Sequence, residues 1–250
     1  MEGAFERLAW DSELFGFDVA RIATSALRDS GLAHVLADLR DRRVVLAYGA
    51  LDDADARSAA AAERAGGRLV DVKVTYIREL TEEDRESDPE ALASVADSGA
   101  REASPELERL ALQSGAFSRF RTDPAVPDGV FERLYRTWIR RSVAREIADR
   151  VLVVGAPGEA PGGMVTLRFD GEVGSIGLLA VESGVRGHGH GRLLLRAAHD
   201  EGRAHGCSLA RLVTQAANAP ACRLFEAAGY RVERRERIFH FWLTKGPGAE

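Results

Sequence analysis

The sequence has little cysteine, almost no lysine and no long apolar run. Its two cysteines, Cys207 and Cys222, belong to no C-x-x-C pair and stand beside no histidine at metal-ligand spacing. We therefore interpret both as reduced core thiols and expect no metal site. Lysine occurs only at positions 73 and 245, although lysine and arginine together number 34. Because arginine is the general basic residue of this chain, a single arginine is weak evidence for an anion site.

The charge balance and the absence of apolar runs narrow the classes of partner. The formal net charge is −5 at pH 7, so we expect no nucleic-acid partner. No segment approaches the roughly 20 apolar residues of a membrane helix, so we expect no membrane partner. Residues 1–10 lack the apolar core of a secretory signal, which favours a cytoplasmic location. The length of 250 residues allows one large domain or two small ones.

The first part of the chain predicts a small α/β unit. Its expected elements are a strand at 44–48, an Ala-rich helix at 54–65 that ends before Gly66 and Gly67, and a strand at 69–77. Residues 81–90 are mostly acidic and contain Pro89, which is typical of a connector. We therefore place an N-terminal α/β domain at 1–90 and a second domain at 91–245.

The second part predicts a longer, mixed series of elements. We expect helices at 105–115, from 130 onward, at 192–205 and at 219–228, a hairpin of strands 151–154 and 164–167, strands at 175–181 and 209–214, and a long strand or hairpin at 230–243. Phe131, Leu134, Tyr135 and Trp138 share one helix face, and we interpret this aromatic stripe as core. The expected fold class is a mixed α/β sheet flanked by helices, with a smaller N-terminal α/β domain.

The two parts share one order of elements. Residues 59–80 and 221–243 both read as helix, glycine and long strand. The first domain is therefore either a degenerate half-copy of the second or similar to it by chance.

A glycine-rich segment joins a predicted strand to a predicted helix. After the strand at 175–181, Gly187, Gly189 and Gly191 alternate with other residues, and an amphipathic helix follows. Glycines let the main chain approach a phosphate closely, and the first turn of a helix offers free N–H groups at the positive end of its dipole. The segment predicts an anion site, although a glycine loop alone also suits a tight turn or any phosphate ligand.

This segment resembles the coenzyme A loop of GNAT N-acetyltransferases. Two family patterns are matched in order, Leu-x-Val at Leu179 and Val181 and Arg/Gln-x-x-Gly-x-Gly/Ala at Arg186, Gly189 and Gly191. Residues 218–230 are similar to a third, Asn-x-x-Ala-x-x-Leu-Tyr-x-x-x-Gly-Phe, with Phe225 and Tyr230 in place of its Tyr and Phe. The resemblance implies a GNAT fold with acetyl-CoA as cosubstrate. It also implies that main-chain amides at 187–192 bind the pyrophosphate and that the preceding strand pairs with the pantetheine arm.

The resemblance assigns a set of cofactor-binding residues. They are Leu179, Ala180, Val181, Arg186, Gly187, His188, Gly189, His190, Gly191, Arg192 and Asn218. Asn218 is expected at the pantetheine arm, although a helix N-cap alone explains it equally well. His188 and His190 have no third ligand nearby, so we interpret them as solvated loop residues rather than a metal pair.

Other segments are similar to the dTDP-fucosamine acetyltransferase branch of this family. They are residues 8–16, 118–124 and 238–243, together with the aromatic helix. The similarity implies an amine acceptor that is a nucleotide-linked 4-amino-4,6-dideoxy sugar, with Ser118, Arg119 and Arg121 as substrate-binding residues. Guanidinium groups suit a diphosphate, but an Arg-rich surface loop is nearly as good an explanation. A homodimer is compatible with the sequence.

The expected reaction is direct attack of a neutral amine on the thioester. Many members of the family use a Tyr to protonate the leaving thiolate, and Phe225 stands at that position here. A thiol pKa of about 8.5 makes thiolate a fair leaving group without an acid. We hypothesise that His240 is the missing titratable group, with a core histidine as an equally good interpretation.

Two alternatives stay open at this point. The chain is also compatible with an enzyme that acetylates another small amine, an antibiotic or a protein N-terminus. Because Phe225 has no proton to give, a non-catalytic acyl-CoA-binding module is the third reading.

Overall fold

The computed structural model describes residues 3–28, 31–81, 92–156 and 159–244. Within these ranges the strands form one ten-stranded sheet in the order β1-β2-β3-β10-β4-β9-β8-β7-β6-β5. The strands are β1 (Phe5–Arg7), β2 (Val19–Ile22), β3 (Leu46–Asp52), β4 (Arg68–Glu79), β5 (Val95–Asp97), β6 (Arg150–Val154), β7 (Gly163–Asp170), β8 (Val173–Val181), β9 (Leu209–Gln215) and β10 (Arg231–Trp242).

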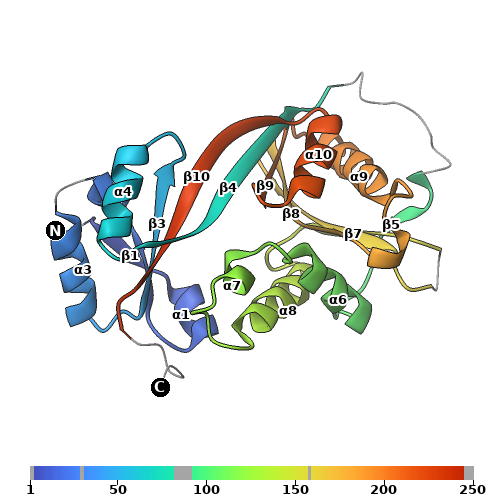
Figure 1. The fold of residues 1–250 in the computed structure, drawn as a ribbon. Coiled ribbons are helices and arrows are strands. Elements are labelled where there is room, and N and C mark those ends of the chain that lie inside the picture. Colours follow the sequence, from blue (N-terminus) through green and yellow to red (C-terminus); the bar gives the residue numbers. More distant parts are fainter. Residues whose placement is uncertain (1–2, 29–30, 82–91, 157–158, 245–250) are drawn as a thin grey trace.

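Helices cover both faces of this sheet (Figure 1). They are α1 (Ala9–Phe15), α2 (Thr24–Arg28), α3 (Leu32–Asp41), α4 (Ala56–Arg64), α6 (Pro105–Ser114), α7 (Arg119–Thr122), α8 (Val130–Val143), α9 (His190–Ala204) and α10 (Ala219–Ala227). The mixed α/β architecture that the sequence predicts is confirmed, with the sheet mostly antiparallel.

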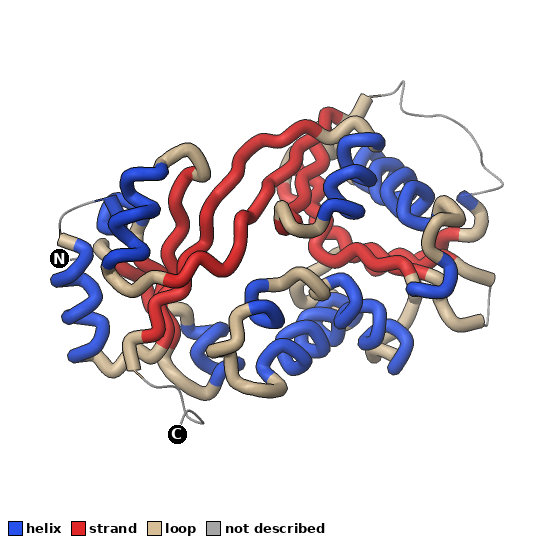
Figure 2. The backbone as a smooth tube through the Cα atoms, viewed as in Figure 1, coloured by secondary structure: helices blue, strands red, loops and turns tan. Residues whose placement is uncertain are grey.

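The two longest strands are exchanged between the two parts of the chain. β10, near the end of the chain, lies between β3 and β4, whereas β4, from the first part, lies between β10 and β9. Figure 2 shows both strands running from one group of helices to the other. The sheet is therefore continuous across both parts, and the expected boundary at residues 90 and 91 lies outside the described residues.

The core is divided among the faces of the sheet. Helices α9 and α10 pack on one face of the second part, against Val74 and Tyr76 of β4 among others. Helices α6 and α8 cover the opposite face. On β10, Phe239 packs towards α3 and α4, whereas His240 faces the other way because side chains alternate along a strand. The face under α6, α7, α8 and α1 is the one that carries the site.

Local signals explain several element boundaries. The Ser104 hydroxyl accepts a hydrogen bond from the Leu107 N–H at 3.3 Å, which starts α6 where the sequence predicts a helix. Asp55 caps α4 in the same way, so that helix begins at Ala56 rather than at 54. Residues 231–242 form one long strand, which settles the choice between strand and hairpin.

Candidate active site

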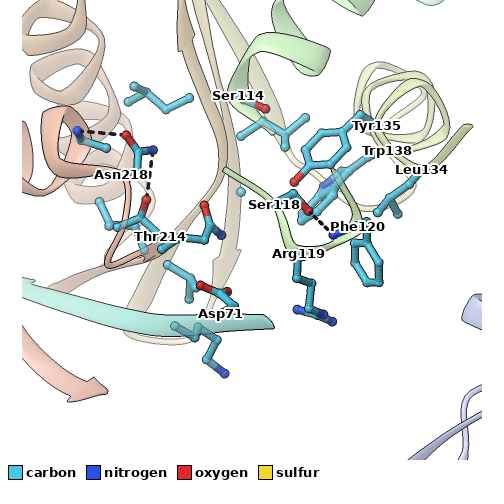
Figure 3. Close-up of a pocket in the computed structure, with 18 of the residues that line it drawn as sticks. Asp71, Ser114, Ser118, Arg119, Phe120, Leu134, Tyr135, Trp138, Thr214 and Asn218 are labelled. Carbon is cyan, nitrogen blue, oxygen red and sulfur yellow. Dashed lines mark hydrogen bonds between the residues drawn. The ribbon is translucent and has the colours of Figure 1, made fainter. Parts of the chain in front are cut away.

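The sheet opens between two neighbouring parallel strands. Among the described strand residues, the pairing of β8 with β9 ends at Ile176 and Leu212, although β8 continues to Val181 and β9 to Gln215. A cavity of about 360 Å³ lies at this opening (Figure 3). Its end near β8 and β9 is mostly apolar, lined by Leu134, Trp138, Ile176, Leu178, Leu179, Leu212, Val213, Ala221 and Phe225.

Main-chain N–H groups of β8 face this opening. The Leu178 N–H donates to the Thr166 hydroxyl at 2.8 Å, and the Glu182 N–H donates to the Gly162 carbonyl at 2.8 Å, so both point towards β7. Because successive residues of a strand point to opposite sides, the N–H groups of Leu179 and Val181 point towards the opening. An extended arm that carries amides can pair with them as an added strand.

The predicted glycine loop leads into α9 as expected. Gly187 and Gly189 adopt left-handed conformations with φ of 84° and 86°, and no side chain caps the start of the helix at Gly189. The first-turn N–H groups are thus left to bind an anion. Gly191 serves a different purpose. A Cβ there would lie 3.0 Å from the Leu224 side chain, so the absence of a side chain lets α9 approach α10.

The polar side chains around the loop differ in their surroundings. Arg186 donates to the Val181 carbonyl and to Gln113, each at 3.1 Å. His188 is exposed, and Arg192 is exposed at the start of α9. His190 has a buried Nδ1 with no hydrogen-bond partner among the described residues. In the part of the chain that the structure describes, no cluster of His, Cys, Asp or Glu could hold a metal ion.

Asn218 is compatible with both interpretations that the sequence left open, a helix N-cap and a residue of the binding site. Its side-chain oxygen accepts from the Ala221 N–H and its amide donates to the Thr214 hydroxyl, each at 3.3 Å (Figure 3). It therefore caps α10 and also lines the cavity. Phe225, which also belongs to α10, lines the cavity and is 4% exposed.

The other end of the cavity is charged. It is lined by Trp10 and Asp11 of α1, Arg21 of β2, Asp71 and Lys73 of β4, and Arg119 of α7. The Lys73 ammonium lies 2.6 Å from the Glu236 carboxylate. Burial raises the pKa of Asp71 to about 6, although Arg119 and the Val72 N–H act in the opposite direction.

Arg119 is held over two aromatic rings. Its guanidinium carbon lies 4.9 Å from the centre of the Tyr48 ring and 4.3 Å from that of Phe120. Among the described residues no carboxylate lies within 4.0 Å of this guanidinium. A cation that is oriented but not paired is suited to bind an anionic group of a ligand.

The other two predicted substrate residues differ in position. Ser118 lines the cavity and caps α7, accepting a hydrogen bond from the Phe120 N–H at 3.3 Å. Arg121 lies outside the cavity lining, with its guanidinium 5.4 Å from the centre of the Phe131 ring. The aromatic stripe needs a correction: Phe131 is core, but Tyr135 and Trp138 also form a cavity wall.

His240 lies apart from the cavity. Its ring is fully buried between Tyr48 and Phe120, and its Nδ1 lies 2.7 Å from the Asp123 carboxylate. His240 does not line the cavity. Its proposed proton-transfer role stays a prediction, and the geometry is that of a residue that positions α7 through Asp123.

Sequence reasoning missed the charged residues of β4. Asp71 and Lys73 alternate with Val70, Val72 and Val74, which reads as an ordinary half-exposed strand. A signal was present, because two charges on one face of an otherwise apolar strand are unusual when both faces are covered. Their place beside β9 depends on the strand exchange, which no local pattern shows.

Comparisons with known proteins agree with this geometry. The chain matches the acetyltransferase (GNAT) family over residues 115–230. It is similar in fold to a GCN5-related N-acetyltransferase from Sphaerobacter thermophilus, with a TM-score of 0.63 and 18% identity over 98% of this chain and 78% of that one. The chain therefore has the GNAT fold, and the match to the family model is confined to residues 115–230.

Two further proteins are similar to this chain. A tandem GNAT protein from the clavulanic acid biosynthesis pathway matches with a TM-score of 0.55 and 18% identity, over 92% of this chain and 76% of that one. The N-alpha-acetyltransferase 30 of Saccharomyces cerevisiae is 38% identical over 73 residues, which are 29% of this chain and 40% of that protein.

No helix among the described residues has the length and apolar character to cross a membrane.

Proposed function

We propose that the protein transfers the acetyl group of acetyl-CoA to the amino group of a nucleotide-linked 4-amino-4,6-dideoxy sugar. The uncapped start of α9 and the glycine loop suit the pyrophosphate of the coenzyme. The apolar opening between β8 and β9 suits its arm and acetyl group. The Leu179 N–H would donate to the thioester oxygen as that oxygen gains negative charge in the transition state.

The observation that carries the acceptor class is the composition of the charged end. Trp10 lines the cavity there and is 37% exposed, and an accessible indole is suited to stack on a nucleobase. The guanidinium groups of Arg21 and Arg119 both act on the nearby carboxylate of Asp11. One aromatic face beside two guanidinium groups is suited to a nucleoside diphosphate.

A protein N-terminus is the second candidate acceptor. The observation in its favour is the 38% identity with the yeast N-alpha-acetyltransferase, confined to 73 residues. That segment covers 29% of this chain and 40% of the yeast protein, so the likeness does not extend to the whole of either protein.

The test uses the full chain, acetyl-CoA and four acceptors, with thiol release as the readout. The acceptors are dTDP-4-amino-4,6-dideoxy-D-galactose, the methyl glycoside of the same amino sugar, a short peptide with a free N-terminus, and an aminoglycoside. We expect kcat/KM for the nucleotide sugar to exceed that of the glycoside at least tenfold. Release with the peptide or the aminoglycoside instead would support the alternatives, and coenzyme A binding without release would indicate a non-catalytic module.

We also propose that residues 1–90 are a degenerate half-copy of the second domain. The unit β3, α4, β4 has the same order as β9, α10, β10, and each unit gives its long strand to the sheet of the other. The likeness to a tandem GNAT protein over 92% of this chain supports this origin.

A further inference from the structure

We propose that Asp71 is the general base that deprotonates the acceptor amine. The inference rests on the proposed acetyl transfer, and it assigns the chemistry to a strand outside the 115–230 acetyltransferase match. Asp71 and Lys73 share the cavity face of β4, whereas Val74 and Tyr76 point into the core under α9 and α10.

The position of Asp71 along the sheet is the first argument. Lys73 pairs with Gln215 at the end of β9, and the Ala216 N–H donates to the Val72 carbonyl at 2.8 Å. Asp71 is the next residue, so it lies beside the turn that leads to Asn218. Figure 3 shows its carboxylate between the Thr214–Asn218 pair and the Ser118–Arg119 segment. Asp71 is therefore the carboxylate of the charged end that lies on the strand next to the opening between β8 and β9.

A comparison with the second carboxylate of the cavity supports the choice. Asp11 accepts a hydrogen bond from the Tyr48 hydroxyl at 3.2 Å, and Tyr48 belongs to β3. From β3 to β9 the sheet passes through β10 and β4, which is three strand spacings or about 14 Å. Asp71 belongs to the strand directly beside β9. Asp11 is therefore placed to orient the acceptor, and Asp71 to meet its amine.

The surroundings of Asp71 suit a base that works near neutral pH. Arg119 and Lys73 favour its charged form, and half-burial disfavours it. The Lys73 ammonium also pairs with the Glu236 carboxylate, so its positive charge is shared and does not fully compensate the charge of Asp71. The opposing effects leave the pKa of Asp71 at about 6, at which the carboxylate is mostly ionised at pH 7 and still basic enough to accept a proton.

The proposed step starts from the acceptor in its ammonium form. The Asp71 carboxylate accepts one proton from the acceptor ammonium, and the freed nitrogen lone pair forms a C–N bond with the thioester carbonyl carbon. The C–S bond then breaks and sulfur leaves as thiolate. The second proton on the nitrogen passes to the thiolate through water, and Asp71 returns its proton to solvent. The products are the amide, free coenzyme A and one proton.

The experiment compares wild type with Asp71→Asn, Asp71→Glu and Asp11→Asn, using the acceptor of highest turnover in the four-acceptor panel. We expect Asp71→Asn to lower kcat at least 100-fold and to abolish the acid limb of kcat that wild type shows near pH 6. Asp71→Glu keeps the limb at a kcat several-fold lower than wild type. Asp11→Asn raises the acceptor KM but keeps the limb. Coenzyme A affinity, measured by calorimetry, stays within about twofold in all three.

Two results would overturn the inference alone. One is an Asp71→Asn variant that retains the limb and a kcat within threefold of wild type. The other is a loss of coenzyme A affinity equal to the loss of turnover, which would show a structural role. A wild type that binds coenzyme A but releases no thiol with any acceptor overturns the proposed function itself, and the base assignment with it.

Discussion

Asp123 holds His240 in a fully buried pair, with 2.7 Å between the carboxylate Oδ2 and the imidazole Nδ1. The same oxygen accepts a hydrogen bond from the Trp242 indole at 3.0 Å. Asp123 follows the short helix α7 directly, so β10 anchors the segment that carries Arg119 into the cavity. Burial lowers the pKa of His240, more than its bond to Asp123 raises it, so the ring is neutral in the folded protein.

The first prediction concerns the pH dependence of stability in His240→Asn. Asparagine keeps a donor for Asp123 but leaves a small cavity, which lowers the free energy of unfolding by about 1–2 kcal/mol at pH 8. Because the pKa of His240 is lower in the folded than in the unfolded chain, the unfolded chain binds the proton first as pH falls, and stability falls with it. The variant lacks this loss, so the gap between the proteins narrows towards pH 5.5 in urea unfolding.

The kinetics of the same variant separate two roles of His240. A positioning role predicts a higher acceptor KM with the pH profile of kcat unchanged. Loss of the acid limb would instead support the proton-transfer role predicted from the sequence. A stability gap that stays constant from pH 8 to 5.5 would contradict the neutral state of the ring.

The second prediction concerns Arg119, with Arg121 as the matched control. Arg119 lies over two rings in the cavity, whereas Arg121 lies over Phe131 outside it. Hydrogen bonds to charged groups contribute about 1.5–3 kcal/mol, so Arg119→Ala is expected to raise the acceptor KM about 10- to 100-fold. Arg121→Ala stays within about twofold of wild type. Equal effects in both variants would argue for a general electrostatic attraction.

The third prediction uses two glycines that flank α9 and have nearly equal backbone conformations. Gly189 at its start has φ of 86° and Gly206 beyond its end has φ of 80°, and a Cβ would meet nothing within 4 Å at either. Alanine in a left-handed conformation costs about 1 kcal/mol, so both variants lose similar stability. Only Gly189→Ala is expected to weaken coenzyme A binding, about tenfold by calorimetry, because its methyl group occupies the phosphate approach. An equal loss in Gly206→Ala would contradict the anion site.

The sequence predicts much of the second part because its signals are local. Ser104 and Pro105 start α6, and the glycines before Arg192 mark the start of α9. Apolar runs identify the strands from 150 to 215, and the Gly/Pro turn at 155–163 predicts the hairpin of β6 and β7. The family patterns fall on the opening of β8 and β9 and on the start of α9, which are formed by segments close together in the chain.

Apart from Arg119, which the family resemblance indicated, the charged end of the cavity could not be predicted in this way. It joins Asp11, Arg21, Asp71 and Arg119, which come from four elements far apart in the chain. Only the exchange of β4 and β10 brings them to one face, and strand order is a long-range property. His240 is predicted as a titratable group from its residue type, but its complete burial depends on α7 and β3 packing over it.

The fourth prediction is that Asp71→Asn stabilises the protein while it lowers activity. Because burial raises the pKa of Asp71 from 3.8 to about 6, the unfolded chain releases its proton first and stability falls as pH rises through that window. The neutral amide removes this loss. Since Asp71 is half-exposed, solvent screening limits the gain to about 1 kcal/mol at pH 8, and the gain is close to zero at pH 4. Calorimetric Tm values at the two pH values measure it, and a loss of stability at pH 8 would contradict it.

The fifth prediction concerns the missing acid at Phe225. This ring lines the cavity and packs 5.8 Å from the centre of the Tyr76 ring and 6.1 Å from that of Tyr230. In Phe225→Tyr the added hydroxyl can protonate the leaving thiolate, and we expect kcat to rise about tenfold, less than the usual 100-fold or more of a positioned acid because thiolate already leaves well. Phe225→Leu keeps an apolar side chain without a hydroxyl and serves as the control, with no gain expected. If Phe225→Tyr leaves kcat unchanged while binding coenzyme A normally, proton transfer to sulfur does not limit the rate, and the substitution of Phe for Tyr costs this protein nothing in turnover.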